Sequence, residues 1–593
     1  MKRSDQKLAK AIQDWFKTSV TFEDEPYVID LEQATAVIDD NNSTIVAARA
    51  GSGKTRTIVA KIVYLVAKQK IKPDEIMVFV FNANAAKEIN ARLSQMKVNQ
   101  KPIIEDAKIA STFHAFSRQV VYNWCGGKAK CKEILAEQKE DYLLYIVKQL
   151  MKEEIWEVKI KQFLLGDLSD ETLENLWQRP EYVTTELERF AKMMAQFVNR
   201  AQQKYLGSGS SLGEKTNQYL KTHDVESRER LFIELGNECY NRYHRYLLSK
   251  NPLKSSAFSK YGTDFNLIVS WASKLIEEKR GKTKKLLAHK KYLLIDEYQD
   301  FSQLFLYAVF AIRSVASSAK LFVVGDDLQA INRFAGSEVE YFKNFEDYFG
   351  KSSSRLAIST NYRCGYEIVR VAHKFMKKAM HDKGSFKAFS KKSGQVISIN
   401  INLIEYHPAM TDYDPRANKE DQIYQKTLRK LLSHSPKITT AKYLKVLTNI
   451  IKENKSANNI LILHRNNEMN IESISLEQLQ SNLRKALIIF NIMDSAEFDQ
   501  KIHIMTMHKS KGLEAEVVII LEADEGVIPK THPDTSLYTI FGETNEIALL
   551  DQKRLFYVAI TRAKKKLYII HDQPTKNSFI KFLGKNLNSW QDL

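Results

Sequence analysis

The residues best suited to chemistry lie near the start of the chain, where glycines alternate with small side chains before a lysine. The segment Ala48-Arg49-Ala50-Gly51-Ser52-Gly53-Lys54-Thr55 follows the apolar run Ile45-Val46-Ala47 and precedes a second apolar run that begins at Ile58. Glycines let backbone N–H groups approach a phosphate without an intervening Cβ, and a helix start adds its own positive end. At this spacing Lys54 can pair with the β- and γ-phosphates, and the Thr55 hydroxyl can bind Mg²⁺. The pattern predicts a strand, a phosphate loop and a helix that bind a nucleoside triphosphate.

Two adjacent acids, Asp296 and Glu297, follow another apolar run, Tyr292-Leu293-Leu294-Ile295. An aspartate at the carboxyl end of a buried strand can hold Mg²⁺ through water, and the neighbouring glutamate can deprotonate the water that attacks a γ-phosphate. A helix N-cap is the plainer explanation of such a pair. Because a phosphate loop needs an acidic partner, we expect Asp296 to be the metal ligand and Glu297 the base.

Three further residues complete the candidate catalytic set. Gln329 lies in Val324-Gly325-Asp326-Asp327-Leu328-Gln329, where a turn would explain the glycine and aspartates but not the glutamine. Arg363 and Arg562 carry planar, permanently charged guanidinium groups, which suit the charge that develops on a transferring phosphoryl group. Taken alone, neither arginine would justify a role. We expect Gln329 to sense the γ-phosphate and the arginines to stabilise its charge.

Short apolar runs alternate with helical stretches along most of the chain, which indicates buried parallel strands in α/β domains. Between about Val120 and Ala288 the pattern is helical, without comparable strand runs, and it is broken once by the glycine- and serine-rich stretch 207–213. This change predicts a helical domain inserted between two strands of the first α/β domain, with a flexible loop inside it. The predicted strands are Ile76–Val80, Tyr292–Ile295, Leu321–Val324, Ile460–Leu463, Val517–Ile520 and Leu567–Ile570.

Composition limits the partners and the compartment. The 593 residues carry a formal net charge of +18, which favours a polyanion, although a solvated lysine-rich surface would give the same charge. Nucleic acid is the better candidate than a membrane, because no apolar run is long enough to span a bilayer. Four scattered cysteines do not form a disulfide framework, and the first residues lack an apolar signal core. We expect a reducing, cytoplasmic location and no membrane association.

A series of segments, taken in order, resembles the motifs of the UvrD/Rep/PcrA helicases of superfamily 1. The series spans nearly the whole chain, and it excludes kinases, ABC proteins and AAA+ proteins as explanations of the same phosphate loop. Its members are Gln33, the phosphate loop, Phe81-Asn82-Ala83-Asn84-Ala85-Ala86-Lys87-Glu88, Ser111-Thr112-Phe113-His114, Asp296-Glu297-Tyr298-Gln299-Asp300, Gly325-Asp326-Asp327-Leu328-Gln329, Asn361-Tyr362-Arg363, Thr506-Met507-His508-Lys509-Ser510-Lys511-Gly512-Leu513-Glu514 and Tyr557-Val558-Ala559-Ile560-Thr561-Arg562-Ala563.

The resemblance implies an α/β motor of two RecA-like domains, 1A and 2A, with ATP in the cleft between them and single-stranded DNA across their top. Domain 1A would comprise 1–118 and 288–353, with a large helical 1B insertion at 119–287. Domain 2A would occupy 354–593. The large 2B domain of the family would be reduced to a small insertion near 405–435, which suggests a motor that is unrestrained or is regulated by 1B or by another protein.

The resemblance also implies roles for individual residues. Gln33 would recognise adenine, Tyr362 would stack on the base and Glu514 would lie near the ribose. The implied nucleotide contacts are Gln33, Ala48, Arg49, Ala50, Gly51, Ser52, Gly53, Lys54, Thr55, Arg56, Tyr362 and Glu514, with Thr55 and Asp296 holding Mg²⁺. The implied DNA contacts are Phe81, Asn82, Thr112, Phe113, His114, Phe334, Thr506, His508 and Lys509. Taken singly, each phenylalanine is better explained as core, because phenylalanine is most often buried.

The chain departs from the family pattern at several positions. After Gln329 the family usually has an aromatic residue, then tryptophan and arginine, whereas this chain has Asn332, Phe334 and Ala335. Gln552 stands where an acid often precedes the last motif. Arg49 stands in the phosphate loop where a glycine is common. These changes bear on the coupling of hydrolysis to movement more than on hydrolysis itself.

Three functions fit this pattern. The leading hypothesis is an ATP-dependent helicase that moves 3′ to 5′ on single-stranded DNA and at junctions with duplex, in repair, replication restart or recombination. The second is a DNA-sensing ATPase that regulates a partner nuclease, for example in anti-phage defence. The third is a helicase–nuclease like AddA or RecB, but the about thirty residues after Arg562 are too few for a nuclease domain. A nuclease or a repair factor is therefore a candidate protein partner.

Overall fold

The protein is described by a computed structural model that covers residues 3–128, 131–134, 136–166, 175–206, 211–248, 261–279, 282–382, 384, 386–390, 393–403, 438–470, 473–530, 533–572, 579–583 and 588–589. The chain divides into two compact units. Unit 1 consists of Met1–Ala48, Lys54–Ile358 and Pro533–Asn545, and unit 2 consists of Arg49–Gly53, Ser359–His532 and Glu546–Leu593. The small insertion expected near 405–435 lies outside the described residues, as do residues 207–210 of the expected flexible loop.

Unit 1 is built on a six-stranded parallel sheet in the order β12-β3-β11-β10-β4-β7. Strands β4 and β10 at its centre are apolar throughout because helices cover both faces, so side chains that point to either side are buried. Three runs predicted from sequence are strands of this sheet, namely β4, β10 and β11. The six strands are β3 (Ser43–Ala48), β4 (Ile76–Val80), β7 (Ala110–Thr112), β10 (Tyr292–Ile295), β11 (Lys320–Gly325) and β12 (Ser354–Ile358).

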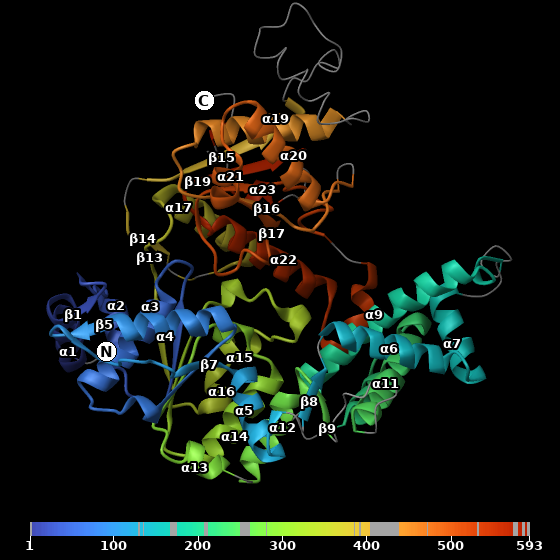
Figure 1. Cartoon of the computed structure of the whole chain (residues 1–593), viewed down its shortest axis with the longest axis horizontal. Coiled ribbons are helices and arrows are strands. Elements are labelled where there is room, and N and C mark those ends of the chain that lie inside the picture. Colours follow the sequence, from blue (N-terminus) through green and yellow to red (C-terminus); the bar gives the residue numbers. More distant parts are fainter. Residues whose placement is uncertain are drawn as a thin grey trace, which may run out of the picture. The chain divides into compact units, whose positions relative to one another are not determined.

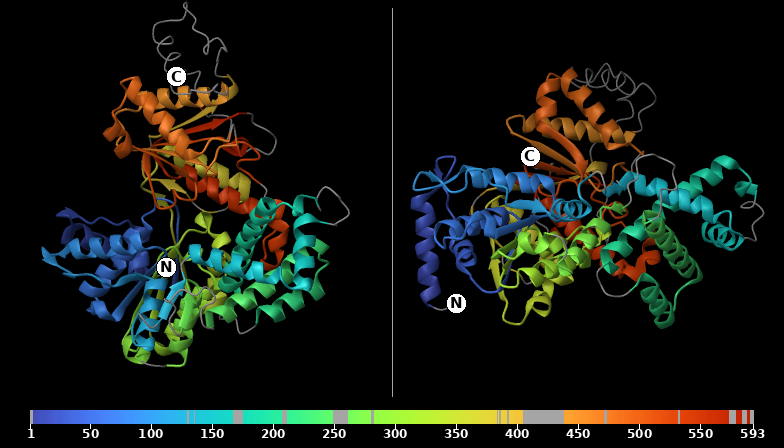
Figure 2. Two further views of the ribbon diagram at one scale, coloured as in Figure 1. Left: turned by 45° about the vertical axis from the view of Figure 1, so that its right-hand side comes forward. Right: turned by 60° about the horizontal axis from the view of Figure 1, so that its bottom comes forward.

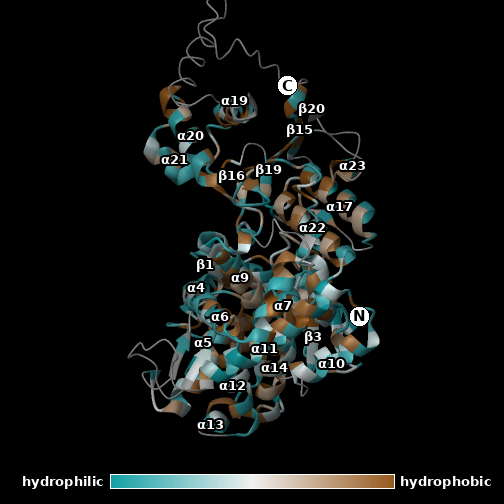
Figure 3. Ribbon diagram, turned by 90° about the vertical axis from the view of Figure 1, so that its right-hand side faces the viewer, coloured by the Kyte–Doolittle hydropathy of each residue, from teal (hydrophilic) through white to brown (hydrophobic). Residues whose placement is uncertain are grey.

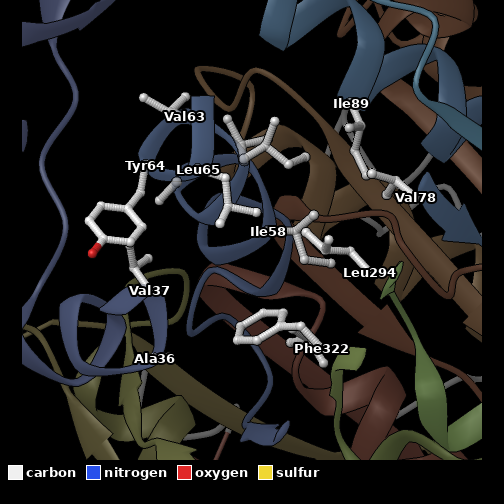
Figure 4. Packing of buried hydrophobic residues seen from close by; sticks show 14 of the residues in the cluster. Ala36, Val37, Ile58, Val63, Tyr64, Leu65, Val78, Ile89, Leu294 and Phe322 are labelled. Atoms are coloured by element: carbon white, nitrogen blue, oxygen red, sulfur yellow. The ribbon is translucent and has the colours of Figure 1, made fainter. Parts of the chain in front are cut away.

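The two faces of this sheet bury separate hydrophobic clusters. On one face Val78, Leu294 and Phe322 pack against residues of α3 such as Ile58, as Figure 4 shows. The opposite face buries alternate strand residues such as Phe79 against the other helices. The helices on the first face are α1 (Arg3–Ser19), α2 (Leu31–Ile38), α3 (Lys54–Ala67) and α4 (Ala83–Gln95). Those on the second face are α5 (Phe113–Cys125), α12 (Leu267–Glu277), α13 (Thr283–Leu287), α14 (Gln303–Val315), α15 (Glu340–Lys343) and α16 (Phe345–Phe349).

A small antiparallel sheet, in the order β2-β1-β5-β6, adjoins the first hydrophobic cluster of unit 1. Val20 and Met96 from this sheet are fully buried in that cluster. Its strands are β1 (Val20–Phe22), β2 (Glu25–Pro26), β5 (Met96–Val98) and β6 (Lys101–Pro102).

The helical insertion forms a bundle with its own hydrophobic cluster within unit 1, drawn cyan and green in Figures 1 and 2. Its helices carry hydrophobic and hydrophilic residues together, as Figure 3 shows, because one face of each packs inward while the other meets water. The bundle comprises α6 (Ala136–Leu150), α7 (Glu154–Leu165), α9 (Pro180–Tyr205), α10 (Leu212–Thr222) and α11 (Ser227–Leu248). It also has one parallel strand pair, β8 (Cys131–Ile134) with β9 (Tyr261–Asp264), which the helical pattern did not predict.

The helices of the expected insertion, 119–287, join two different cores. The end of α5, α13 and most of α12 pack on the core of the sheet, whereas Leu267 of α12 is buried in the core of the bundle. A helical pattern shows which face of a helix is apolar, but not which core that face joins. The bundle core also includes Leu537 and Phe541, which belong to the segment Pro533–Asn545, a part of unit 1 that is flanked on both sides in the sequence by residues of unit 2.

Unit 2 is built on a second six-stranded parallel sheet in the order β17-β16-β18-β19-β15-β20. The other three predicted runs lie in its strands β16, β18 and β19. Because β12 pairs with β3 in the first sheet, unit 1 extends to Ile358, beyond the boundary expected at 354. The strands are β15 (Gln395–Asn400), β16 (Ile460–His464), β17 (Ile502–Thr506), β18 (Ala515–Ile520), β19 (Ala563–His571) and β20 (Asn588–Ser589).

Helices flank the second sheet, and a short parallel pair, β13 (Thr360–Asn361) with β14 (Lys387–Ala388), precedes it. The predicted fold class, two parallel α/β sheets with a helical insertion, is confirmed. Among the described helices, none has the length and apolarity needed to cross a membrane. The helices of unit 2 are α17 (Tyr366–Met380), α19 (Ile438–Glu453), α20 (Leu476–Ile489), α21 (Ser495–Lys501), α22 (Asn545–Ile560) and α23 (Ile580–Leu583).

Candidate functional site

The glycine-rich loop joins the end of β3 at Ala48 to the start of α3 at Lys54. Gly51 and Gly53 have φ angles of +70° and +85°, a region that favours glycine because it has no Cβ. A Cβ on Gly51 would also lie 2.7 Å from the Oδ1 atom of Asn361. Both glycines therefore serve the turn, and Gly51 also permits a close approach of Asn361.

The loop residues Arg49–Gly53 belong to unit 2, and residues of that unit hold them. The Asn361 side chain donates from Nδ2 to the Ala50 carbonyl oxygen at 2.7 Å, and the Tyr362 N–H donates to the Gly51 carbonyl oxygen at 2.9 Å. Arg49 pairs with Asp382 at 3.2 Å. Asn361 belongs to one of the motifs, but it was assigned no role from the sequence. Its amide side chain, next to Tyr362, could have indicated a hydrogen bond to backbone.

Lys54, Thr55, Asp296 and Glu297 come together at the carboxyl edge of the unit 1 sheet. The distance from Lys54 Nζ to Glu297 Oε1 is 3.7 Å, and that from Thr55 Oγ1 to Asp296 Oδ2 is 3.5 Å. Because β3 and β10 are parallel and end at the same edge, the loop after one strand meets the acids after the other. Burial raises the pKa of Asp296 to about 7, with a further rise from Glu297, whereas Lys54 opposes the shift. A buried carboxylate next to a lysine and a hydroxyl is suited to hold a cation.

Glu297 has a backbone conformation that is uncommon for its residue type. Its φ of +52° lies in the left-handed region, where a side chain costs free energy. Its carboxylate accepts a hydrogen bond from the Gln299 side chain, and the Gln299 Oε1 atom accepts one from the Asp326 N–H at 2.9 Å. The strained residue is thus fixed between β10 and β11 at the same edge as Lys54.

Gln329 lies at this edge but points into the protein. It is 3% exposed, and its Nε2 atom donates to Asp326 Oδ2 at 2.7 Å. Asp326 in turn accepts the Leu328 N–H at 3.2 Å, which fixes the short helical turn that follows β11. Gln329 therefore follows β11, the neighbour of the strand that precedes Asp296 and Glu297, and its carboxamide is hydrogen-bonded to Asp326.

The donor set fits a magnesium ion that is shared with a substrate. Thr55 and Asp296 present oxygen atoms to the same space, and Mg²⁺ in phosphate-transfer sites uses one or two protein oxygens together with water and phosphates. Over the described ranges, no cluster of three or more His, Cys, Asp or Glu side chains has a geometry that could hold a metal by itself. The remaining ligands would come from the nucleotide and from water.

Arg363 forms a charged cluster within unit 2. Its Nε atom donates to Glu514 Oε2 at 2.7 Å, and Glu514 Oε1 pairs with Lys564 Nζ at 2.5 Å. Burial raises the pKa of Glu514, but Lys564 and Arg363 outweigh it, so the net pKa is lowered. Sequence reasoning assigned Arg363 and Glu514 but missed Lys564, which follows Arg562 by two positions.

Arg562 is buried inside unit 2, with an exposed fraction of 1%. Its Nε atom donates to the Val558 carbonyl oxygen at 2.9 Å, and its guanidinium also donates to the Leu513 carbonyl oxygen at 3.1 Å. Backbone carbonyls hold the charge in place, which fixes the orientation of the planar group. The same bonds join the end of α22 to the turn that precedes β18.

The remaining candidate nucleotide residues lie in different settings. Gln33 is 1% exposed, and its Oε1 atom accepts the Asp30 N–H at 3.0 Å in a capping box of α2. Arg56 lies over the Tyr27 ring at 4.9 Å. In unit 2, Tyr362 is half-exposed and its ring centroid lies 5.0 Å from that of Phe389. Phe389 is 69% exposed, and sequence reasoning missed it because no motif includes it.

The residues expected to contact DNA divide into exposed and buried groups in unit 1. Phe81 and Phe334 are 42% and 56% exposed, as stacking residues would need to be. Asn82 and Thr112 cap helices α4 and α5, because their side-chain oxygens accept the N–H groups of residues three positions later. The caps fix the two helix starts beside the strand ends from which these residues emerge.

Phe113 and His114, which are also expected to contact DNA, are both buried. Phe113 is 4% exposed, and its ring stacks on Phe79 with centroids 4.1 Å apart, so it is a core residue. His114 stacks on Phe265 at 3.3 Å, and burial together with the Arg118 charge lowers its pKa to about 3. Both residues line a cavity of about 10 Å³ together with Phe81, Asp296 and Glu297, which links the motif residues to the acidic pair.

Three expected DNA contacts lie at the end of β17 in unit 2. Thr506 is buried, and its hydroxyl accepts the Lys509 N–H at 3.4 Å. Lys509 is exposed, whereas burial and the Arg465 charge lower the pKa of His508 to about 4. The turn after β17 thus presents the Lys509 ammonium to solvent and keeps the His508 imidazole neutral.

Comparisons with protein families identify the chain. A model of the UvrD/REP helicase N-terminal domain matches residues 29–350, more than half of the 593 residues. This chain belongs to the UvrD/REP helicase family. A model of the UvrD-like helicase C-terminal domain matches residues 467–573 as well. The resemblance proposed from the motifs is therefore confirmed, and ATP-dependent DNA helicases are the class of enzyme to which it leads.

Several relatives align with most of this UvrD/REP-family chain. DNA helicase IV of Escherichia coli (strain K12) is 25% identical over 572 residues, which cover 94% of the chain and 70% of that protein. A probable DNA helicase II homolog of Mycoplasma genitalium is 22% identical over 673 residues, covering 94% and 87%. ATP-dependent DNA helicase Rep of Buchnera aphidicola subsp. Acyrthosiphon pisum is 23% identical over 634 residues, covering 92% and 94%. The match extends over both units of the UvrD/REP-family chain.

Proposed function

We propose that this UvrD/REP-family chain hydrolyses ATP to move 3′ to 5′ along single-stranded DNA and to separate duplex at junctions. Repair, replication restart or recombination is the setting that suits such a motor. The substrate rests on the relatives, which are named as DNA helicases. The polarity and the setting rest on the motif resemblance.

The observation that carries the proposal is the meeting of Lys54 and Thr55 with Glu297 and Asp296 at one sheet edge. The Lys54 ammonium would neutralise charge on the β- and γ-phosphates. The Glu297 carboxylate would take a proton from the attacking water, because it lies 3.7 Å from the Lys54 ammonium that would hold the γ-phosphate. Gln329, whose side chain is hydrogen-bonded to Asp326 at this edge, would sense the γ-phosphate.

A magnesium ion would be held by Thr55 and Asp296. When bound, it would polarise the phosphate oxygens and neutralise developing charge. Arg363 and Arg562 would stabilise charge on the γ-phosphoryl group, and Tyr362 together with Phe389 would offer aromatic faces to the adenine.

DNA would be contacted by exposed aromatic side chains and by polar side chains that lie at the ends of strands. Phe81 and Phe334 would stack on bases, at about 1–3 kcal/mol for each base, and such stacking is nearly independent of sequence. A motor that steps along any strand needs this independence. Asn82, Thr112, Thr506, His508 and Lys509 would contact the backbone of the strand.

The decisive experiment follows strand displacement and ATP turnover in the same reaction, on duplexes that carry a 3′ or a 5′ single-stranded tail. Displacement of the 3′-tailed duplex alone would support the proposal. Displacement of the 5′-tailed duplex alone would overturn the polarity. DNA-stimulated turnover without displacement on either substrate would replace the helicase with a DNA-sensing ATPase that acts on a partner nuclease.

A further inference from the structure

A cavity of about 390 Å³ lies in unit 1 between α5 and α13, away from the acidic pair. Its apolar walls include Val120 and Leu286, which pack on the core of the sheet. Since α13 precedes the first residue of β10 whereas Asp296 follows the last, the cavity lies at the opposite edge of the sheet. Its volume is within the range of about 300–1,000 Å³ that small-molecule sites occupy.

Trp124 lines this cavity with a partly exposed indole side chain. It lies in the last turn of α5, is 42% exposed and lines the cavity beside Asn123. A partly exposed indole ring can stack on a planar ligand. The Asn123 amide adds a donor and an acceptor next to that ring.

The polar rim of the cavity is cationic. Lys282 and Lys285 are exposed and line it, and neither forms an ion pair with another described residue. His289 also lines the rim, with a ring nitrogen 3.1 Å from the Asp74 carbonyl oxygen. Among the described residues that line the cavity, none is an aspartate or a glutamate. The rim therefore suits an anion, and the ring beside it suits an aromatic base.

The charge around the cavity extends further than a small anion needs. The sequence from 279 to 291 contains seven lysines and arginines and no aspartate or glutamate. Lys291 pairs with Glu75 at 2.9 Å. Lys282 and Lys285, which line the cavity, are the lysines that a ligand there would meet. A basic run of sequence that is longer than the two lysines lining the pocket favours a polymeric anion over a mononucleotide.

The cavity is separate from the expected DNA contacts at the motifs. Thr112 caps the start of α5 and Trp124 lies near its end, so the two are about 18 Å apart at 1.5 Å for each helical residue. At about 3.4 Å for each nucleotide of a duplex strand, this distance spans about five nucleotides. One bound strand or duplex can therefore reach both places only if it runs along the length of α5.

We propose that this cavity is a second DNA contact, in which one nucleotide of the strand stacks on Trp124 while its phosphates pair with Lys282 and Lys285. The inference rests on the proposed function, because it takes DNA as the nucleic acid on which the chain acts. It assigns a role to residues outside every helicase motif in the sequence.

The test measures the affinity of the full chain for a 30-nucleotide oligothymidylate at several salt concentrations. The variant Trp124→Ala should bind about 5- to 150-fold more weakly, whereas Trp124→Phe should keep most of the affinity because it keeps a stacking ring. The double variant Lys282→Ala/Lys285→Ala should reduce the slope of log K against log salt by about 1.4. The control, Lys7→Ala/Lys17→Ala, removes the same charge from exposed positions of α1 and should leave the slope unchanged.

A strand that carries 5-iodouracil should also crosslink to the peptide that contains Trp124. Wild-type affinity and slope in the Trp124→Ala and double-lysine variants, with DNA-stimulated ATP turnover intact, would overturn this inference and leave the proposed function standing. Competition by thymidine monophosphate as strong as that by the strand would overturn the assignment to a strand. If the wild-type chain neither bound DNA nor hydrolysed ATP, the proposed function would be overturned as well.

Discussion

Glu297 has a backbone conformation that few glutamates adopt. Its φ of +52° costs free energy that the surrounding structure must supply, and the Gln299 side chain and Lys54 hold its carboxylate in place. Strain of this kind persists where position matters more than stability. This strain supports the proposed role of Glu297 as the base.

Replacing Glu297 with glutamine should keep nucleotide binding and lower ATP turnover by about 10²- to 10⁴-fold, because an amide cannot accept the proton from water. Turnover with saturating DNA and the binding of a fluorescent ATP analogue are measured on the same preparation. Glu277→Gln is the matched control, since this glutamate accepts a hydrogen bond from Tyr307 elsewhere in unit 1. Unchanged turnover in the Glu297 variant would remove it from the base role.

Arg562→Ala should lower turnover by about 10³-fold or more if the guanidinium stabilises the γ-phosphoryl charge. Because Arg562 is buried and bonded to backbone carbonyls, the substitution also costs stability. Arg554→Ala separates the two effects, since Arg554 is a buried arginine of α22 that pairs with Asp551. Equal losses of turnover in both variants, in step with equal losses of thermal stability, would show that Arg562 acts through folding alone.

The most informative single element is the segment Pro533–Asn545, which joins unit 1 although its sequence neighbours belong to unit 2. Its helical turn η8 (Pro533–Phe541) packs on α9 and α11. The Phe541 ring meets that of Phe197 edge to face at 4.9 Å, and Arg200 lies 4.0 Å over the Tyr538 ring. Glu543 pairs with Arg200, and Lys204 donates to the Phe541 carbonyl oxygen at 3.0 Å. The bundle core is complete only with this segment in place.

Phe541→Ala should lower the free energy of unfolding of unit 1 by about 3–5 kcal/mol, because it removes a buried ring and leaves a cavity between α9 and the segment. Urea denaturation followed by circular dichroism measures the change. Leu549→Ala serves as the control, since Leu549 is 40% exposed on α22 and its truncation should cost less than about 0.5 kcal/mol. A loss no larger than that of the control would show that the segment is not part of the core.

The start of α5 makes stability depend on pH. Burial lowers the pKa of His114 from 6.5 to about 3, so between these values the unfolded chain binds a proton that the folded chain does not. The free energy of unfolding should therefore fall as pH decreases below 6.5, by about 2 kcal/mol at pH 5, until the loss is complete near pH 3. Thermal melts at pH 7 and pH 5 should show a smaller fall for His114→Gln than for the wild-type chain. Equal falls would contradict the buried, neutral histidine.

The whole chain carries far more positive than negative charge, with 89 lysines and arginines against 71 aspartates and glutamates. Some of these cations are used within the protein, as in the buried pair Lys139–Asp264, in which desolvation is offset by the ion pair and its hydrogen bonds. Others, including Lys509 and the lysines near α13, are exposed. Charge distributed in this way suits a long polyanion that crosses several elements.

DNA affinity should fall steeply between 50 and 200 mM salt, because each phosphate that is neutralised releases counterions, with a slope of about −0.7 for each contact on a single strand. A titration of one oligonucleotide at four salt concentrations gives this slope. A stacking-only complex would show little dependence on salt. A flat response would therefore contradict the view that the basic surface is the DNA-binding surface.

The sequence by itself determined the fold class and the ingredients of the nucleotide site. Parallel strands with both faces covered must be apolar throughout, so each predicted run became a strand of one of the two sheets. The phosphate loop and the acids that follow β10 were also readable, because their spacing along the chain is set by the chemistry of phosphate and Mg²⁺. Their meeting at one edge follows from parallel strand order.

The tertiary structure alone decided which of these side chains are accessible and which core each helix joins. Phe113 and Phe81 occupy equivalent motif positions after neighbouring strands, yet one packs between Phe79 and Phe305 while the other is exposed. Likewise, Pro533–Asn545 completes the helical bundle, and Asn361 holds the phosphate loop. Such outcomes depend on contacts between residues that are far apart in the sequence, and a local sequence pattern does not predict those contacts.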